Sequence, residues 1–125
     1  MVILVLTPER DTDEAVERVK GEKDLLVLYV IEEELPESVG SWLMYAGFLG
    51  ENPSLEVKRI IVDELERRAH ERLEEIKKKL GDVEAVIEKG VLQEIMEKYC
   101  REKRPERFVI PKGEKIKTEC KIEEV

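Results

Sequence analysis

Two unbroken apolar runs lie near the N-terminus of the chain, Val2–Leu6 and Leu25–Ile31. Neither run alternates with polar residues, which is the pattern of a strand that helices cover on both faces. The runs therefore predict two central strands of one sheet. Two shorter apolar segments, Val83–Ile87 and Arg107–Ile110, predict further strands of the same sheet.

The segments between these strands have helical periodicity. Asp11, followed by Glu14 three residues later, fits a capping box at the start of a short first helix. Apolar residues at steps of three or four predict a long helix over Asn52–Leu80 and another over Val91–Glu102. The alternation of strands and helices predicts an α/β fold with an open, mostly parallel, Rossmann-type sheet and helices on both faces.

The last part of the chain departs from this alternation. Too few residues separate Ile110 from Ile116 to hold a helix. Apolar and small residues then alternate with charged ones, which predicts a half-covered strand at an edge of the sheet or against a second subunit. The alternating residues are Ile116, Thr118, Cys120 and Ile122. We interpret all 125 residues as one domain with one core.

The net charge restricts the kind of partner, and the lengths of the apolar runs restrict the expected location. The formal net charge is −8 at pH 7, which argues against a nucleic-acid partner. No apolar run approaches the roughly 20 residues of a membrane span, and the first residues lack a basic leader, so we expect a cytoplasmic protein. Glu and Lys dominate, and Asn52 and Gln93 are the only side-chain amides, a composition typical of thermophilic proteins.

Few residues offer catalytic or metal-binding chemistry. Cys100 and Cys120 are the only cysteines and His70 is the only histidine, which is too small a set for a zinc site. Glu66 lies one turn before His70, but no nucleophile accompanies them, so we interpret His70 as a solvated helix residue. Two interpretations of the cysteines stay open: Cys100 as a small core residue, or a disulfide between the pair.

Turn residues follow several of the predicted strands. Parallel strands bring their carboxyl ends to one edge of the sheet, where α/β proteins bind ligands. One interpretation is a nucleotide crevice; the other, which we favour, is that these are ordinary turn residues, because every such loop needs proline, glycine and small polar side chains. The residues concerned are Thr7, Pro8, Glu9, Val30, Gly90, Pro111 and Gly113.

A long connection before Asn52 contains an apolar segment, Trp42–Leu49. Long connections of this kind tend to be functional or to pack on themselves. The segment either presents Trp42 and Phe48 to a protein partner, a ligand or a second subunit, or folds back over an open end of the core. The sequence favours neither interpretation.

The order and spacing of these elements resemble those of a universal stress protein. The resemblance rests on Val2–Pro8 as the first strand and loop, the strand Asp24–Val30, the long second helix, and Val86–Gly90 followed by Arg107–Pro111. It extends from the N-terminus to about Gly113. It implies a fold like that of the adenine-nucleotide hydrolases and a homodimer joined through the last strand, here Ile116–Ile122.

Members of this family that bind ATP share two features. One is an aspartate just after the first strand, where this chain has Pro8–Glu9 and reaches Asp11 only later. The other is a loop of the form G-x-x-G, nine residues, G-[ST] after the fourth strand, whereas no glycine follows Gly113 in this chain. Glycines let backbone amides approach a phosphate, and side chains obstruct that approach.

We therefore predict a non-enzymatic regulatory or interaction module that has no cofactor and does not bind ATP in the usual way. Two alternatives accompany this prediction. One is a sensor that holds AMP or ATP in the crevice. The other is an enzyme of the wider nucleotide-hydrolase superfamily, which a chain with one histidine, on a different helix, does little to support.

Overall fold

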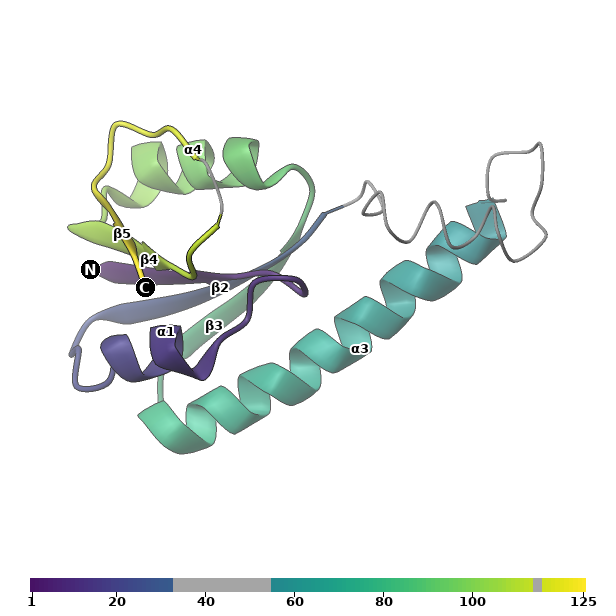
Figure 1. Cartoon of the computed structure of the whole chain (residues 1–125), viewed down its shortest axis with the longest axis horizontal. Coiled ribbons are helices and arrows are strands. Elements are labelled where there is room, and N and C mark those ends of the chain that lie inside the picture. Colours follow the sequence, from purple (N-terminus) through teal and green to yellow (C-terminus); the bar gives the residue numbers. More distant parts are fainter. Residues whose placement is uncertain (33–54, 114–115) are drawn as a thin grey trace.

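A computed structural model describes residues 1–32, 55–113 and 116–125, without the side chains of 55–58. The described strands form one sheet in the order β3-β2-β1-β4-β5, and every neighbouring pair is parallel (Figure 1). The strands are β1 (Val2–Leu6), β2 (Leu25–Ile31), β3 (Glu84–Lys89), β4 (Arg107–Ile110) and β5 (Ile122–Glu124). The predicted parallel, Rossmann-type sheet is confirmed.

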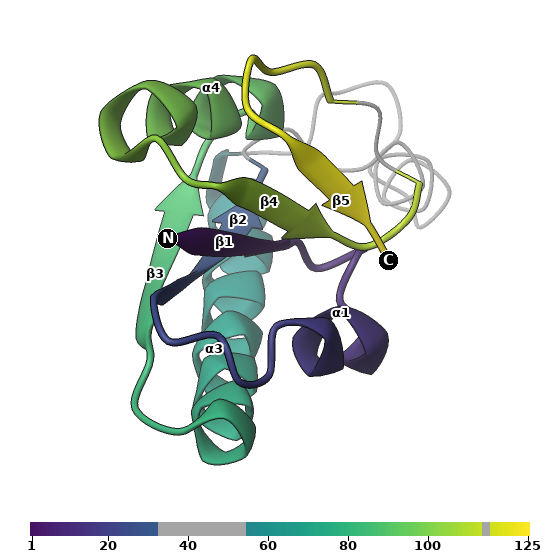
Figure 2. The ribbon, with the colours of Figure 1, turned by 90° about the vertical axis from the view of Figure 1, so that its left-hand side faces the viewer.

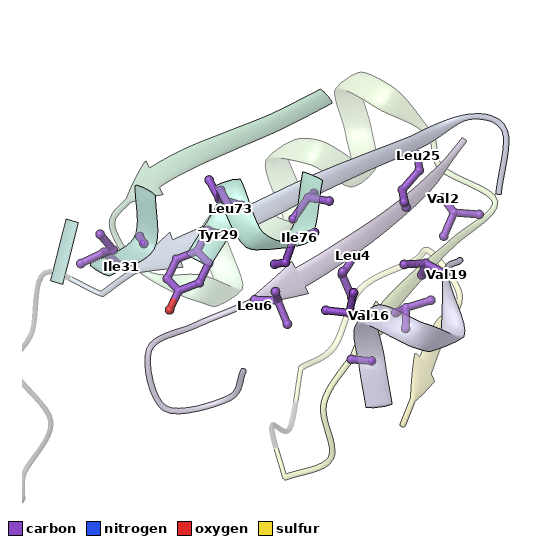
Figure 3. Close-up of a cluster of buried hydrophobic side chains, with 14 residues drawn as sticks. Val2, Leu4, Leu6, Val16, Val19, Leu25, Tyr29, Ile31, Leu73 and Ile76 are labelled. Atoms are coloured by element: carbon purple, nitrogen blue, oxygen red, sulfur yellow. The ribbon is translucent and has the colours of Figure 1, made fainter. Parts of the chain in front are cut away.

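Helices cover both faces of this sheet. On one face lie α1 (Asp13–Arg18) and α3 (Leu55–Leu80), and on the other lies α4 (Leu92–Lys103) (Figures 1 and 2). Successive side chains of β1 and β2 alternate between two apolar clusters, and Figure 3 shows the cluster on the side of α1 and α3. Every residue of β1 and β2 is buried, as their unbroken apolar pattern predicted.

The first helix begins one residue later than the capping box predicted. Its N-cap is Thr12, whose hydroxyl accepts a hydrogen bond from the amide of Ala15 at 3.3 Å. Asp11 lies outside the helix and accepts hydrogen bonds from Arg72 of α3 instead. The prediction was wrong because a threonine hydroxyl also serves as a cap, while Asp11 has a cation within reach only once the chain has folded.

The bounds of β3 and of α3 can be compared with the predicted ones. The third strand runs from Glu84 to Lys89 rather than Val83–Ile87, because its pairing with β2 continues to the end of that strand. The predicted start of the long helix at Asn52 and the apolar segment Trp42–Leu49 lie outside the described residues. The helix ends at Leu80, as predicted.

The last strand is shorter than the alternating pattern predicted. β5 contains only Ile122–Glu124, and the described part of the preceding connection is irregular. Ile116, Cys120 and Ile122 pack against the cluster beside α4, although only Ile122 belongs to a strand, so the alternation reflects burial on this cluster rather than one face of a long strand. A disulfide joins Cys120 to Cys100, which decides between the two interpretations of the cysteines. β5 does lie at an edge of the sheet.

The C-terminal half of α3 attaches it to the sheet. Ala69, Leu73 and Ile76 are buried in the cluster that this helix shares with β1 and β2. Ile60, in the other half, is 64% exposed. Figure 1 shows that half running beyond the sheet. The apolar stripe of α3 therefore extends beyond the part of the helix that is buried against the sheet.

This difference predicts unequal costs for one substitution at two places on α3. We expect Ile76→Ala to lower the free energy of unfolding by about 2–5 kcal/mol, because it leaves a cavity in a closed core. The control Ile60→Ala makes the same chemical change at an exposed site and should alter stability by no more than about 0.5 kcal/mol. Denaturant unfolding measures both, and equal losses would contradict the attachment described here.

Candidate functional site

The carboxyl ends of β1 and β4 lie side by side where the strand order reverses. The chain passes from β1 to β2 on one side, and β4 lies on the other, so this is the topological switch point of the sheet. The loop after β1 contains Thr7–Arg10, and the loop after β4 contains Pro111–Gly113. Ligands of open α/β sheets bind at such a place, which makes these two loops the candidate site.

A closed turn forms the first loop. The amide of Arg10 donates to the carbonyl of Thr7 at 3.1 Å and to its hydroxyl at 3.0 Å, and the amide of Thr7 donates back to the carbonyl of Arg10 at 3.2 Å. Thr7 is buried, whereas Pro8 and Glu9 are exposed at the tip. The polar atoms of Thr7 therefore hold the turn together.

Arg10 brings the two loops into contact. Gly113 has a φ of 115°, which favours glycine, and a Cβ there would lie 2.7 Å from the guanidinium carbon of Arg10. The arginine side chain therefore packs directly on the glycine. Arg10 thus joins the loop after β1 to the loop after β4.

Asp11, the carboxylate nearest to the expected adenine-side aspartate, is bound to α3. It is 17% exposed and accepts two hydrogen bonds from Nε of Arg72, at 2.9 and 3.0 Å. Arg72 also donates to Asp13 at 2.8 Å and to Glu75 at 3.3 Å. The side chain of Asp11 thus ties the loop after β1 to the helix that covers β2.

Burial and charge oppose each other in this cluster. Burial raises the pKa of Asp11, and the hydrogen bonds and charge of Arg72 counteract that rise. Burial lowers the pKa of Arg72, but its hydrogen bonds to Asp13 and Asp11 outweigh burial and raise it. Burial also raises the pKa of Tyr29 to about 12, and the charge of Asp11 adds to this rise. The phenol of Tyr29 is therefore neutral at pH 7, beside the pair of Asp11 and Arg72.

The predicted crevice residues do not all meet. Thr7, Pro8 and Glu9 belong to the turn whose Arg10 reaches Gly113, and Pro111 is buried beside it in the loop after β4. The side chain of Val30 is fully buried in the cluster on the α4 side, so it is turned into the core. Gly90 donates its amide to the carbonyl of Ile31 at 3.0 Å and extends the pairing of β3 with β2.

The predicted interface residues have mixed positions. Ile116, Cys120 and Ile122 contact the core beside α4, and the hydroxyl of Thr118 donates to the carbonyl of Cys120 at 3.0 Å. Their side chains are therefore engaged within the chain, at least in part. Trp42 and Phe48 lie outside the described residues.

Neither a scan against models of protein families nor a search of curated protein sequences gave a match. Solved structures do match over almost the whole chain. The universal stress protein UspA from Lactobacillus plantarum superposes with a TM-score of 0.67 at 14% identity, over 100% of this chain and 97% of that one. This chain has the universal stress protein fold.

Two further solved structures match in the same way. MJ0577, described as a hypothetical protein in a test case of structural genomics, has a TM-score of 0.67 at 19% identity, over 99% of this chain and 94% of that one. The hypothetical protein PH0823 has a TM-score of 0.62 at 20% identity, with the same coverage. At these identities the likeness concerns the fold, which agrees with the resemblance that the strand and loop spacing indicated.

The sequence pattern did not identify Arg10 or Arg72 as residues of the candidate site, although both connect the loop after β1 to other elements. Arg72 had a signal, because it lies three residues after Ala69 and four before Ile76, in the stripe of α3 that faces the sheet. A cation in such a stripe indicates a buried partner. Arg10 had no local signal, because its contact with Gly113 arises only when β1 and β4 become neighbours.

Other chemistry is limited in the part of the chain that the structure describes. His70 is exposed, and Glu66 one turn away pairs with Lys89 at 2.8 Å. Within residues 1–32, 55–113 and 116–125, no three His, Cys, Asp or Glu side chains converge to hold a metal ion. None of the described helices is long and apolar enough to cross a membrane.

The half-buried pair predicts a pH-dependent effect of removing Arg72. In Arg72→Met, Asp11 loses its counter-charge, and we expect a loss of about 1–3 kcal/mol in the free energy of unfolding at pH 7. The folded pKa of Asp11 then lies further above its ordinary value of 3.8. The folded state therefore takes up a proton first, so the stability of the variant should recover as the pH falls through that raised pKa toward 3.8.

Two control variants separate this effect from the loss of any arginine. Asp11→Asn in the Arg72→Met background should abolish the recovery at low pH, because no carboxylate remains there to protonate. Arg67→Met removes an exposed arginine of the same helix that pairs with Glu64, and it should have a much smaller effect. A loss in Arg72→Met that did not change with pH in denaturant titrations would contradict the account.

Proposed function

We propose that this protein is a cytoplasmic, dimeric regulatory or interaction module of the universal stress type that does not bind ATP in the usual way. The observation that carries the proposal is the packing of Arg10 on Gly113 at the switch point of the sheet. The place where the family resemblance would put the phosphates is covered by a side chain of the protein itself. The partner proposed for the segment around Trp42 and Phe48 rests on the sequence alone.

The chain after Gly113 supports the proposal on the phosphate side. A phosphate site of this kind needs a row of backbone amides, which a glycine-rich loop provides. This chain has no glycine beyond Gly113. The described part of the connection that follows is joined to α4 by the disulfide at Cys120, which supports a structural use of this segment over a phosphate-binding one.

The pairing of Asp11 supports the proposal on the adenine side. An aspartate that addresses a ligand must have a carboxylate that can turn toward it. Both oxygens of Asp11 accept from Arg72, and turning Asp11 away would leave the half-buried guanidinium without one of its partners, which costs about 1–3 kcal/mol. The charged groups with shifted pKa at this edge serve the fold, which supports a regulatory use over a catalytic one.

A nucleotide sensor is the second candidate, and Arg10 is the observation that favours it. A guanidinium binds phosphate well because its planar set of donors matches the phosphate oxygens. If Arg10 turned away from Gly113, it would meet a ligand at the switch point. Such a site would suit one phosphate group better than three, so this candidate predicts binding of AMP in preference to ATP.

Calorimetric titration with ATP, ADP and AMP distinguishes the two candidates, once the purified protein has been shown to hold no nucleotide. For the interaction module we expect no saturable heat at millimolar ligand. Saturable binding of AMP that Arg10→Ala abolishes would support the sensor instead. Lys112→Ala is the matched control, because it removes an exposed cation from the neighbouring loop. Saturable ATP binding to the wild type would contradict the proposal.

The dimer is proposed to form through the outer edge of β5. The amide of Val125 donates to the carbonyl of Ile110 at 2.9 Å, and the carbonyl of Val125 accepts from Lys112 at 3.1 Å. Backbone groups of a strand alternate in direction, so those of Ile122 and Glu124 point away from β4. An unpaired edge of this kind is a template for a strand from a second copy.

A proline at position 124 tests this edge. Glu124→Pro removes one outward N–H and leaves the bonds to β4 in place. We expect light scattering to give twice the chain mass of 14.6 kDa for the wild type and for Glu124→Ala, which keeps the N–H. Glu124→Pro should shift the protein toward the monomer. Pairing at this edge would be ruled out if Glu124→Pro and Glu124→Ala formed dimers of equal stability, or if the wild type were monomeric throughout.

A further inference from the structure

β5 returns to the sheet without the helix that such a strand normally has. A parallel neighbour is usually reached through a crossover helix, which covers the returning strand and holds it down. Between β4 and β5 the described residues of the connection contain no helix. The connection passes on the side of the sheet where α4 lies (Figures 1 and 2). β5 itself pairs with β4 over only Ile122–Glu124.

The non-covalent contacts that hold this segment are apolar and polar. Ile116, Cys120 and Ile122 pack against the cluster beside α4, and the amide of Val125 donates to the carbonyl of Ile110 at 2.9 Å. Gln93 of α4 donates to the carbonyl of Lys117 at 2.5 Å and accepts from its amide at 3.2 Å, in an exposed setting. Glu123 of β5 pairs with Arg18 at 2.6 Å and with Arg107 at 2.9 Å. The contacts made by Gln93 and Arg18 are exposed and contribute little to stability because water competes for them.

The disulfide is the strong attachment. It fixes the Cα of Cys120 6.0 Å from that of Cys100 in α4, two positions before β5 begins. A covalent bond so close to a short strand keeps that strand at high effective concentration beside β4. The disulfide therefore helps to hold β5 beside β4, as a crossover helix does for a strand elsewhere in the sheet.

The disulfide also borders an open hollow of about 360 Å³. This volume is near the lower end of the range of ligand pockets, roughly 300–1,000 Å³, so a small reagent fits. Cys100 lies in its wall and is 7% exposed, so a thiolate of the reagent reaches the disulfide from this hollow. Two cations, Arg101 and Lys117, line the hollow and are balanced by two carboxylates. The remaining lining residues are Glu97, Thr118 and Glu119.

We propose that the Cys100–Cys120 disulfide is a redox-controlled clasp, which a dithiol opens to release β5 from the sheet. One thiolate of the dithiol attacks a disulfide sulfur, forms a mixed disulfide and expels the other cysteine as a thiolate. The second thiolate of the reductant attacks the mixed disulfide and frees the second cysteine. Two electrons pass to the protein, its two thiolates take up two protons, and the dithiol becomes a cyclic disulfide.

The state of the disulfide then decides which strand forms this edge of the sheet. In the oxidised protein the edge is β5, whose seat is fixed through Cys120. In the reduced protein the connection after Ile110 is no longer held to α4 by a covalent bond, and β5 opens more often. A cross-link that closes a loop of about 20 residues changes such an equilibrium by about a hundred-fold.

Hydrogen exchange measured by mass spectrometry, with and without dithiothreitol and in the absence of denaturant, tests the proposal. We expect dithiothreitol to release two alkylatable thiols per chain from the native protein. Within residues 121–125, the amides that face β4, such as that of Val125, should then exchange about a hundred-fold faster. The amides of β2, at the centre of the sheet, should be unchanged and serve as the internal reference.

Two variants complete the test. Cys100→Ala combined with Cys120→Ala should show the fast exchange at residues 121–125 without reductant and no response to dithiothreitol. Gln93→Ala removes a non-covalent contact to the same connection and should change that exchange less than tenfold. The proposal is overturned if the disulfide resists dithiothreitol until denaturant is added, or if the reduced wild type protects residues 121–125 as well as the oxidised protein does.

Discussion

The burial of β1 and β2 on both faces is the constraint on which the rest of the structure depends. A strand covered on both sides needs a helix layer above and below it, and a chain that supplies those helices between its strands makes the strands parallel. Parallel strands bring their carboxyl ends to one edge. Because β1 is buried throughout and lies parallel to β4, the loops that follow these two strands meet at one edge of the sheet. Any function of this edge depends on that meeting.

At this edge the chain uses charged side chains to join its own elements. Arg10 spans the two loops and packs on Gly113, and Asp11 joins the first loop to α3 through Arg72. Asp11 and Arg72 are half-buried and costly to separate, so a contact that stabilises the fold also opposes a ligand that competes for it. β5 pairs with β4 over three residues, and the disulfide at Cys120 joins the segment before it to α4.

The sequence predicted those parts of the fold whose cause lies in consecutive residues. Continuous burial leaves a continuous apolar run, so Leu25–Ile31 could be recognised as a central strand, and periodic burial marked α3 and α4. The errors occurred where the cause lies far along the chain. Asp11 was interpreted as a cap because its partner Arg72 is 61 residues away. Ile116 and Cys120 suggested a strand because contact with α4 produced an alternation that resembles one.

The edge of the sheet where the two candidate loops lie could be predicted from the sequence, but the side-chain contacts between the loops could not. Parallel topology places Thr7 and Gly113 at the same edge, and turn residues at those positions could be read from the sequence. That Arg10 lies on Gly113 depends on the register of β1 with β4, which no local pattern contains.

The most direct measurement is a crystal structure of the protein grown with magnesium and ATP at millimolar concentration. The account predicts Arg10 on Gly113 and Asp11 on Arg72 as they are here, with no nucleotide between the loops after β1 and β4. A nucleotide seated there, with its phosphates at the amide of Gly113 and Arg10 displaced, would contradict it.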